Sequence, residues 1–401
     1  MSIFLRTIPV EEAIHAATSI APHPGREEIP LEDAAGRVLA EAITADVDIP
    51  GFNRSIVDGY AVRASDTIGA GETIPSMLTL LGTVRMGQAP VLSLKTGECA
   101  YIPTGGELPD GADAVVMIEH CERIDDQVLV KRPVAPGENL IRKGEDFARD
   151  MMVLPGGRRL TPPEIGVLAA VGCHTVPVCT RPSIGVISTG NELIPVREIP
   201  TGSQIRDSNS AMIGAYLQRS GCCATLYGVI PDDRQSLQRA LERALSQNDA
   251  VILSGGSSKD DRDLCADIIG DLGEVLVHGV AIAPGKPTII GKCRGKPVLG
   301  LPGHPASALV VLDRIGRPLL AAMAGEVMRP ACTRSAQLAQ NIPSVRGRED
   351  YVRVRLEGDR AYPLFGKSGL LNTLVQSDGL IRIPAGREGL EEGETIEVIM
   401  W

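Results

Sequence analysis

Four segments of the chain place glycine, proline, serine or charged residues shortly after a short apolar run. The segments are 188–192, 254–258, 284–287 and 302–307, and the apolar runs before them are 184–187, 251–253, 275–277 and 298–301. A helical pattern is expected after each of the four turns. Parallel strands bring such turns and helix N-termini to one edge of a sheet, where free backbone N–H groups attract anions. The pattern therefore predicts a site for a phosphorylated or oxyanionic ligand.

Two of these segments offer direct contacts to an anion. Lys286 lies in a Pro-Gly-Lys-Pro turn that restricts its backbone, and Ser307 follows Pro302-Gly303 near an expected helix start. The turn at 255–258 adds backbone N–H donors and serine hydroxyl groups. The structural alternatives are a solvated lysine at 286 and glycines that serve only the backbone geometry of the turn.

Acidic residues near the same turns could bind magnesium, which prefers one or two carboxylates together with phosphate oxygens of a substrate. Asp261 and Asp263 follow the second turn, and Asp232 and Asp233 precede a helix expected around 237–245. An acidic helix N-terminus in solvent, or a helix cap, explains these residues equally well.

Composition narrows the class of protein. The chain has 401 residues, a formal net charge of −10 and only 3% aromatic residues, which argues against binding to nucleic acid. Nine scattered cysteines without a CxxC pair indicate reduced thiols. No apolar run is long enough to span a bilayer and no secretory signal is visible, so a cytoplasmic protein without membrane contact is expected.

The elements that must position these residues indicate an α/β multidomain protein. Strands and helices alternate over 180–326, as in a three-layer α/β domain with a largely parallel sheet. Strand-like runs separated by Gly and Pro over 46–140 predict an inserted β domain with a hairpin at Asp125-Asp126, and 327–401 predicts a C-terminal β barrel or sandwich. Residues 1–45 and 141–179 flank this insertion and would together form an elongated linker domain.

That linker domain is expected to be helical. Glu11 and Glu12 follow Pro9 in the first turn of one predicted helix, and the spacing of Leu31, Ala34 and Val38 predicts a second. The sequence Thr161-Pro162-Pro163-Glu164 is a capping box that predicts a third helix, which should pack against the first segment.

Taken together, the motifs resemble one family over essentially the whole chain: the molybdenum insertases of molybdopterin cofactor synthesis, MoeA and the E domain of gephyrin. The segments that carry the resemblance are 36–41, 50–55, 58–61, 102–106, 144–146, 188–193, 207–209, 254–256, 284–287 and 301–305. Each is weak alone, and their order and spacing make the match specific.

The resemblance implies a reaction. An adenylylated molybdopterin and molybdate enter, the metal is inserted between the dithiolene sulfurs, and AMP is released with help from Mg²⁺. It also implies a homodimer with the site between subunits, and contact with the molybdopterin adenylyltransferase and with acceptor molybdoenzymes.

The resemblance also assigns residues. The molybdate oxyanion would be held by Lys286, Pro287, Arg348 and Ser368, with Arg353 as an alternative to Arg348. Pterin and phosphate would contact Ser188, Thr189, Gly190, Gly255, Gly256, Ser258, Pro302, Gly303 and Ser307. The catalytic residues would be Asp58, Thr104, Glu192, Asp232 and Asp261, with Asp261 and Asp263 as ligands of magnesium. His304 would act by local hydrogen bonding.

The chain departs from the family pattern in two places. Ala283 stands where relatives can carry a second lysine, and the residues at 257–260 differ from the usual stretch after the paired glycines. Three alternatives stay open: a molybdopterin adenylyltransferase that uses ATP, a non-catalytic dimeric scaffold of the gephyrin type, and tungstate in place of molybdate.

Overall fold

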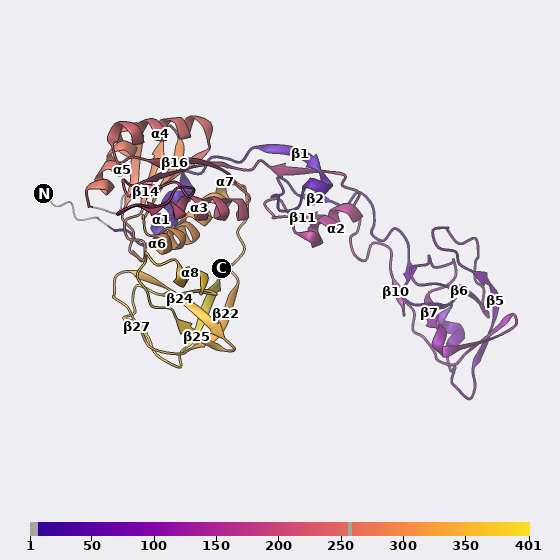
Figure 1. Cartoon of the computed structure of the whole chain (residues 1–401). Coiled ribbons are helices and arrows are strands. Elements are labelled where there is room, and N and C mark those ends of the chain that lie inside the picture. Colours follow the sequence, from indigo (N-terminus) through magenta and orange to yellow (C-terminus); the bar gives the residue numbers. More distant parts are fainter. Residues whose placement is uncertain (1–6, 256–258) are drawn as a thin grey trace.

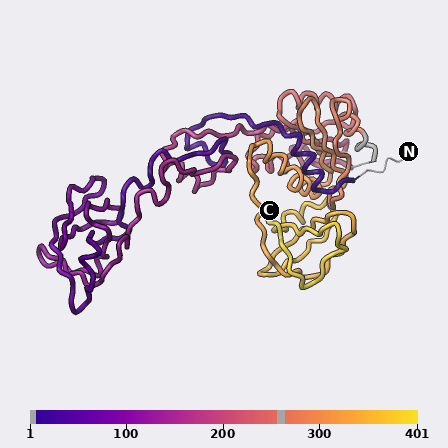
Figure 2. The backbone as a smooth tube through the Cα atoms, turned by 180° about the vertical axis from the view of Figure 1, so that it is seen from behind, coloured from indigo at the N-terminus to yellow at the C-terminus, as the bar shows by residue number. Residues whose placement is uncertain are grey.

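The computed structural model describes residues 7–255 and 259–401, and the side chains of residues 7–255 and 264–401. The molecule is elongated (Figure 1). A large body at one end holds the α/β domain and the C-terminal β domain. A narrow middle region with β1 and α2 leads to a separate β domain at the far end. Figure 2 shows that the chain runs along the middle region twice, outward and back.

The α/β domain is built on a six-stranded sheet in the order β16-β13-β17-β21-β20-β18. The strands are β13 (Ser183–Thr189), β16 (Cys223–Ile230), β17 (Ala250–Gly255), β18 (Gly273–His278), β20 (Ile289–Cys293) and β21 (Lys296–Leu301). The first four strands of that order are parallel, and β20 is antiparallel to both of its neighbours. The carboxyl ends of β13, β17, β21 and β18 therefore lie at one edge.

Helices cover both faces of this sheet, which confirms the three-layer prediction. Leu237, Leu241 and Leu245 of α4 (Arg234–Gln247) are buried at helical spacing in one core, together with residues of α5 (Lys259–Leu272). The core on the other face is formed with α1 (Val10–Ser19), α3 (Ser208–Arg219), α6 (Pro305–Val311), the π-helical turn Leu312–Gly316 and α7 (Arg317–Met323).

Two of the four predicted turns are not followed directly by a helix. The turn at 188–192 leads into β14 (Leu193–Ile194) and β15 (Ile205–Arg206) before α3 begins. The run 275–277 does end at the expected edge as part of β18, but the turn at 284–287 leads into the strand β20 and not into a helix. The β-branched residues Ile289 and Ile290 pair with β21 in the sheet centre. A short apolar run favours a strand once a neighbouring strand is available.

The middle region is less helical than predicted. Helix α1 is present, but it packs on the α/β sheet and not in the middle region. The second predicted helix is wrong: β1 (Arg26–Pro30) is followed by a single 3-10 turn, Leu31–Asp33, and by β2 (Ile43–Thr44). Strand β1 pairs antiparallel with β12 (Thr175–Cys179). The left-handed Gly36 (φ 76°) prevents the turn from continuing as a helix, and pairing with distant strands outweighs the local spacing.

The predicted capping box is confirmed at the start of α2 (Pro162–Ala170). Glu164 accepts hydrogen bonds from the backbone N–H group (2.9 Å) and the hydroxyl group of Thr161. Leu168 of this helix packs with Ala34 and Leu39 of the first segment, as expected. Short strands complete the region, and they are β3 (Arg54–Ser55), β10 (Leu140–Ile141) and β11 (Met152–Leu154).

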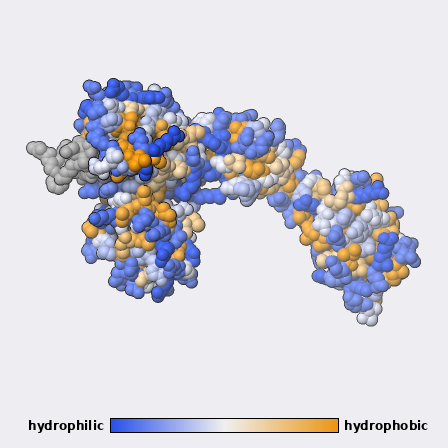
Figure 3. Space-filling view, viewed as in Figure 1, coloured by the Kyte–Doolittle hydropathy of each residue, from blue (hydrophilic) through white to orange (hydrophobic). Residues whose placement is uncertain are grey.

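The inserted β domain has a six-stranded sheet in the order β7-β4-β6-β5-β9-β8. The strands are β4 (Gly59–Val62), β5 (Ser76–Thr83), β6 (Glu98–Ile102), β7 (Ala114–Met117), β8 (Cys121–Ile124) and β9 (Gln127–Val130). The hairpin at Asp125-Asp126 is confirmed, with Asp125 in the left-handed region (φ 55°). The space-filling view shows this domain as a body of its own at the end of the narrow connection (Figure 3).

The C-terminal domain closes into a barrel, as predicted. Its strands follow the order β24-β25-β22-β28-β26, and β26 pairs back with β24. They are β22 (Thr333–Leu338), β24 (Glu349–Glu357), β25 (Arg360–Pro363), β26 (Gly379–Ile383) and β28 (Thr395–Met400). The smaller elements of the two domains are β14 (Leu193–Ile194), β15 (Ile205–Arg206), β23 (Ile342–Pro343), β27 (Gly389–Leu390) and α8 (Asn372–Val375).

One strand joins the α/β domain to the barrel. Strand β19 (Ile282–Ala283), which precedes the Lys286 turn, pairs in parallel with the start of β24, so that Ala283 lies beside Asp350. The pairing brings the sheet edge and the barrel face together. No helix among the described residues is long and apolar enough to cross a membrane.

Candidate active site

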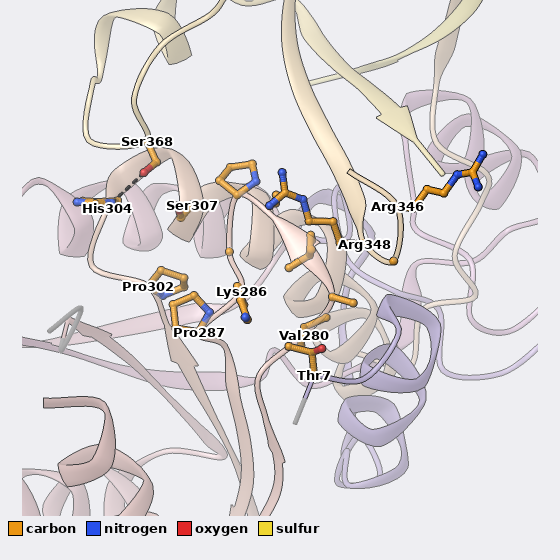
Figure 4. Close-up of a pocket in the computed structure, with 16 residues that line it drawn as sticks. Thr7, Val280, Lys286, Pro287, Pro302, His304, Ser307, Arg346, Arg348 and Ser368 are labelled. Carbon is orange, nitrogen blue, oxygen red and sulfur yellow. Dashed lines mark hydrogen bonds between the residues drawn. The ribbon is translucent and has the colours of Figure 1, made fainter. Parts of the chain in front are cut away.

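A cavity of about 500 Å³ lies where the α/β domain meets the barrel. We call it the cation cavity, because Lys286, Arg346, Arg348 and His304 line it, and no acidic residue does so among the described residues. Figure 4 shows that the lining comes from the 280–287 segment, the Pro302–Ser307 turn and two barrel loops. Six of the predicted anion-binding residues meet here, and they are Lys286, Pro287, Pro302, Ser307, Arg348 and Ser368.

The backbone of the Lys286 turn is fixed on both sides. Gly285 has φ 131°, and a Cβ atom there would lie 2.4 Å from Cγ2 of Val311, so the position requires glycine. The Lys286 carbonyl accepts hydrogen bonds from the N–H groups of Val280 (2.9 Å) and Thr288 (3.0 Å). The lysine side chain is exposed at the cavity wall. A fixed backbone thus presents a solvated ammonium group to a ligand.

The other predicted oxyanion residues differ in their availability. Ser368 Oγ lies 2.8 Å from Nδ1 of His304, so these two side chains hold each other across the two domains. Arg348 is already paired, because its Nε lies 2.8 Å from Oδ1 of Asp350. Asp350 also accepts a hydrogen bond from Ser344 (2.8 Å). Part of the positive charge of Arg348 is therefore neutralised within the protein.

Arg353, the alternative to Arg348, has no such carboxylate partner among the described side chains. It is 6% exposed, one terminal nitrogen donates to the Gly366 carbonyl (3.1 Å), and Nε has no partner. Burial lowers the pKa of its guanidinium group, which shows that the charge is poorly compensated. Arg353 lines a cavity of about 310 Å³ that shares Ala283, Pro284 and Ser368 with the cation cavity.

A further cavity, of about 420 Å³, lies on the other side of His304. We call it the acceptor cavity, because the two acidic residues Glu192 and Asp207 are among the residues that line it. Thr189, Gly255 and Gly303, which the sequence assigned to the substrate, also line it. His304 borders both cavities, so the two are neighbours with the 302–304 turn between them.

The turns that border the acceptor cavity are closely packed. A Cβ atom on Gly255 (φ 139°) would lie 1.9 Å from the Thr189 carbonyl oxygen, so glycine is required for the two strand ends to approach. Asp232 accepts hydrogen bonds from the hydroxyl group of Thr189 and from the N–H group of Asn191 (3.0 Å). Its carboxylate therefore fixes the 189–191 turn in this structure.

Three other predicted residues have structural partners. Ser188 is fully buried, and its Oγ lies 2.7 Å from Oγ of Ser210. Ser188 lines neither cavity. Asp207 is the N-cap of α3 and accepts from the Ser210 N–H group (3.0 Å), as expected for a cap. Gly190 belongs to the turn held by Asp232 but does not line either cavity.

Asp58 and Thr104 meet each other but not the cavities. Oδ1 of Asp58 accepts from the Thr104 N–H group (2.7 Å) and hydroxyl group (3.1 Å). Both residues belong to the inserted β domain, which lies at the far end of the molecule (Figure 1). One chain alone does not bring this pair to the cation cavity.

The magnesium prediction falls largely outside the described part of the chain. Gly256 and Ser258 lie outside the described residues, and so do the side chains of Asp261 and Asp263. Among the described residues, no group of three or more His, Cys, Asp or Glu residues is arranged to hold a metal ion. The described residues thus supply no complete metal site of their own.

Sequence reasoning used Asp207 and Asn209 only as part of the 207–209 motif. Asp207 is the N-cap of α3 and Asn209 lies in its first turn, and both line the acceptor cavity. The Asp-Ser-Asn motif was visible, but its position at the cavity depends on β14 and β15, which bend the chain back before α3. Two residues per strand are too few for a sequence pattern to reveal.

The fold and cavities define a class of protein: a multidomain α/β protein with a cavity lined by lysine and arginine between a sheet edge and a barrel. Family models agree with this along the chain. "MoeA N-terminal region (domain I and II)" matches residues 8–172, "Probable molybdopterin binding domain" matches 185–322, and "MoeA C-terminal region (domain IV)" matches 335–401.

Individual proteins are similar over nearly the full length. The molybdopterin molybdenumtransferase of Bacillus subtilis is 31% identical over 98% of this chain and 94% of its own. The MoeA protein structure from Pyrococcus horikoshii OT3 has a TM-score of 0.87 at 33% identity, covering 99% of this chain and 100% of that chain. A second, from Pyrococcus horikosii, has a TM-score of 0.80 at 40% identity, covering 98% and 99%. The chain belongs to the MoeA family of molybdopterin molybdenumtransferases, which confirms the resemblance.

Proposed function

We propose that this chain inserts molybdate into adenylylated molybdopterin and releases AMP. The observation that carries the proposal is the cation cavity, where Lys286 projects from a rigid turn and no described acid lines the wall. Molybdate is a tetrahedral dianion that already carries its oxygen ligands. Fixed positive charge and hydrogen-bond donors are therefore the groups suited to bind it.

The neighbouring acceptor cavity supports binding of the pterin part of the same substrate. A pterin ring carries N–H donors, which match the carboxylate oxygen atoms of Glu192. The 302–304 turn lies between the two cavities, so a ligand that crosses it would place its dithiolene and phosphate end toward Lys286. In this arrangement the protein acts by orienting the two reactants and by stabilising negative charge.

The proposal includes a second copy of the chain and a magnesium ion. Asp58 and Thr104 would reach the cavities from the partner in a homodimer, since they lie far from them in their own chain. Asp261 and Asp263 remain the predicted ligands of Mg²⁺, which would neutralise phosphate charge when bound. We further propose a cytoplasmic reaction, with the substrate supplied by a molybdopterin adenylyltransferase and the product passed to acceptor molybdoenzymes.

The test supplies purified protein with adenylylated molybdopterin, molybdate and Mg²⁺, and measures AMP release and active cofactor. Lys286→Met should lower kcat/KM about 10- to 150-fold, the loss expected for one charge-assisted contact of roughly 1.5–3 kcal/mol. Lys292→Met is the matched control, because Lys292 is an exposed lysine on β20 outside the cavity. No AMP from the wild-type protein, or equal activity of both variants, would contradict the proposal.

A further inference from the structure

Asn209 ties together three segments that end at the two cavities. It stands in the first turn of α3 and is 8% exposed. Its side-chain NH₂ group donates to Ser254 Oγ (2.9 Å), near the end of β17, and to the Gly303 carbonyl (2.8 Å), in the turn after β21. One amide thus connects a helix start to two strand ends.

The hydrogen bonds fix the orientation of this amide. A backbone carbonyl only accepts, so the nitrogen must face Gly303, and a flipped amide would set two oxygen atoms against each other. The opposite atom, Oδ1, is buried and has no partner among the described residues. An unpaired buried acceptor costs free energy, so the amide is retained for its two donors or for a ligand.

The turn that Asn209 holds is the wall between the cavities. Pro302 lines the cation cavity, Gly303 lines the acceptor cavity, and His304 lines both. His304 in turn holds Ser368 of the barrel. A shift of the Gly303 carbonyl would therefore move the wall and the link to Ser368 together.

We propose that Asn209 is a positioning residue that fixes the 302–304 turn, and so sets the relative placement of the pterin and the oxyanion. The proposal rests on the proposed function for its kinetic consequence, but not for its structural one. Small displacements of reacting groups cost rate more than affinity. Loss of the donors should therefore lower kcat more than it raises KM for either substrate.

The chain contains a matched control for this test. Asn248 is also a buried asparagine (2% exposed), its NH₂ group donates to Ala244 O (2.9 Å) and Tyr227 Oη (2.8 Å), and its Oδ1 also lacks a partner in the described structure. It follows the C-terminus of α4 and lines neither cavity. Asn209→Asp and Asn248→Asp thus remove the same two donors from similar surroundings.

The experiment measures thermal unfolding, steady-state kinetics and the ring NMR signals of His304, assigned with His304→Gln. Both variants should lose similar stability. Asn209→Asp alone should shift the His304 signals and lower kcat at least 10-fold, with KM changed less than threefold. The kcat of Asn209→Asp should recover toward lower pH, because protonation of the introduced carboxyl group restores one donor toward Gly303.

Two further results keep the test decisive. If Asn209→Asp does not fold, Ser254→Ala, which removes one acceptor, should show the same shift of the His304 signals to a smaller extent. Unchanged His304 signals in a folded variant, or equal kinetic losses in the Asn209 and Asn248 variants, would overturn the proposal. A wild-type protein without AMP release would count against the proposed function only, because the NMR comparison needs no turnover.

Discussion

Two arginines five residues apart, Arg348 just before the barrel strand β24 and Arg353 within it, illustrate how pairing decides which charge is available to a ligand. Arg348 shares its charge with Asp350, whereas Arg353 is buried with an unpartnered Nε and a lowered pKa. A buried charge without a counterion destabilises the free protein and gains most from a bound anion. The sequence predicted Arg348 for the oxyanion with Arg353 as the alternative, and we propose from this pairing that Arg353, in the adjoining cavity, contributes more.

We predict opposite effects of Arg353→Met on stability and binding. The substitution should leave the ligand-free protein equally stable or more stable, by up to about 1–3 kcal/mol, because a poorly compensated charge is removed. Molybdate affinity should fall at least tenfold, as measured by titration calorimetry beside thermal unfolding. Arg348→Met serves as the comparison and should weaken binding less. The reverse order of the two affinities would contradict this assignment.

At the scale of elements, the capping box of α2 couples helix stability to pH. Burial alone would raise the pKa of Glu164, but hydrogen bonds from Thr161 and Arg158 outweigh it and lower the pKa to about 2. The pKa in the folded state is thus below the ordinary value of 4.5. The contribution to stability is fully present above about pH 4.5 and is lost as the pH falls toward 2.

We therefore predict that Glu164→Gln destabilises the protein by roughly 1–3 kcal/mol at pH 7, judged from denaturant unfolding. The difference from the wild type should shrink as the pH is lowered from 5 to 3, because this carboxyl group becomes protonated in the unfolded chain while it is still ionised in the folded one. Glu32→Gln, in the neighbouring 3-10 turn, is an exposed control and should change little. A difference that stays constant over this pH range would argue against the carboxylate as the cause.

Elements with a strong local signal were predictable, and elements made by distant pairing were not. A few neighbouring residues are enough to determine the capping box at Thr161, helix α4 with its leucines and the hairpin at Asp125. The segment 31–42 has helical spacing but is held by partners more than a hundred residues away, such as the Leu39 N–H bond to Arg158 O (2.9 Å). The turns of the site were visible for the same local reason, whereas ion pairing at Arg348 depends on the folded barrel.

At the scale of the whole molecule, the distance between Asp58 and Lys286 is the reason for proposing a homodimer. The Asp58–Thr104 pair is built into the distal β domain, while the cation cavity lies at the other end of the same chain (Figure 1). A closed dimer with two-fold symmetry would bring each distal domain to the other copy's cavity, giving two equivalent composite sites.

This arrangement predicts complementation between two inactive variants. Asp58→Asn and Lys286→Met should each release little AMP alone, but co-refolding them in equal amounts should restore about a quarter of the wild-type rate, because half of the dimers then carry one intact site. Sedimentation of the mixture checks that dimers form. Recovery no greater than the sum of the two variants would place both residues in one chain's site.

The position of α1 has a consequence for how this molecule can be divided. Val10, Ala13 and Ala17 lie buried in the core of the α/β domain, although the chain then leaves for the middle region and returns only at β13. The middle region and the distal β domain are therefore an insertion between α1 and the rest of the α/β domain. Shortening the protein from its amino end would open that core, whereas excising the insertion and joining its two stems would leave every layer of the α/β domain in place.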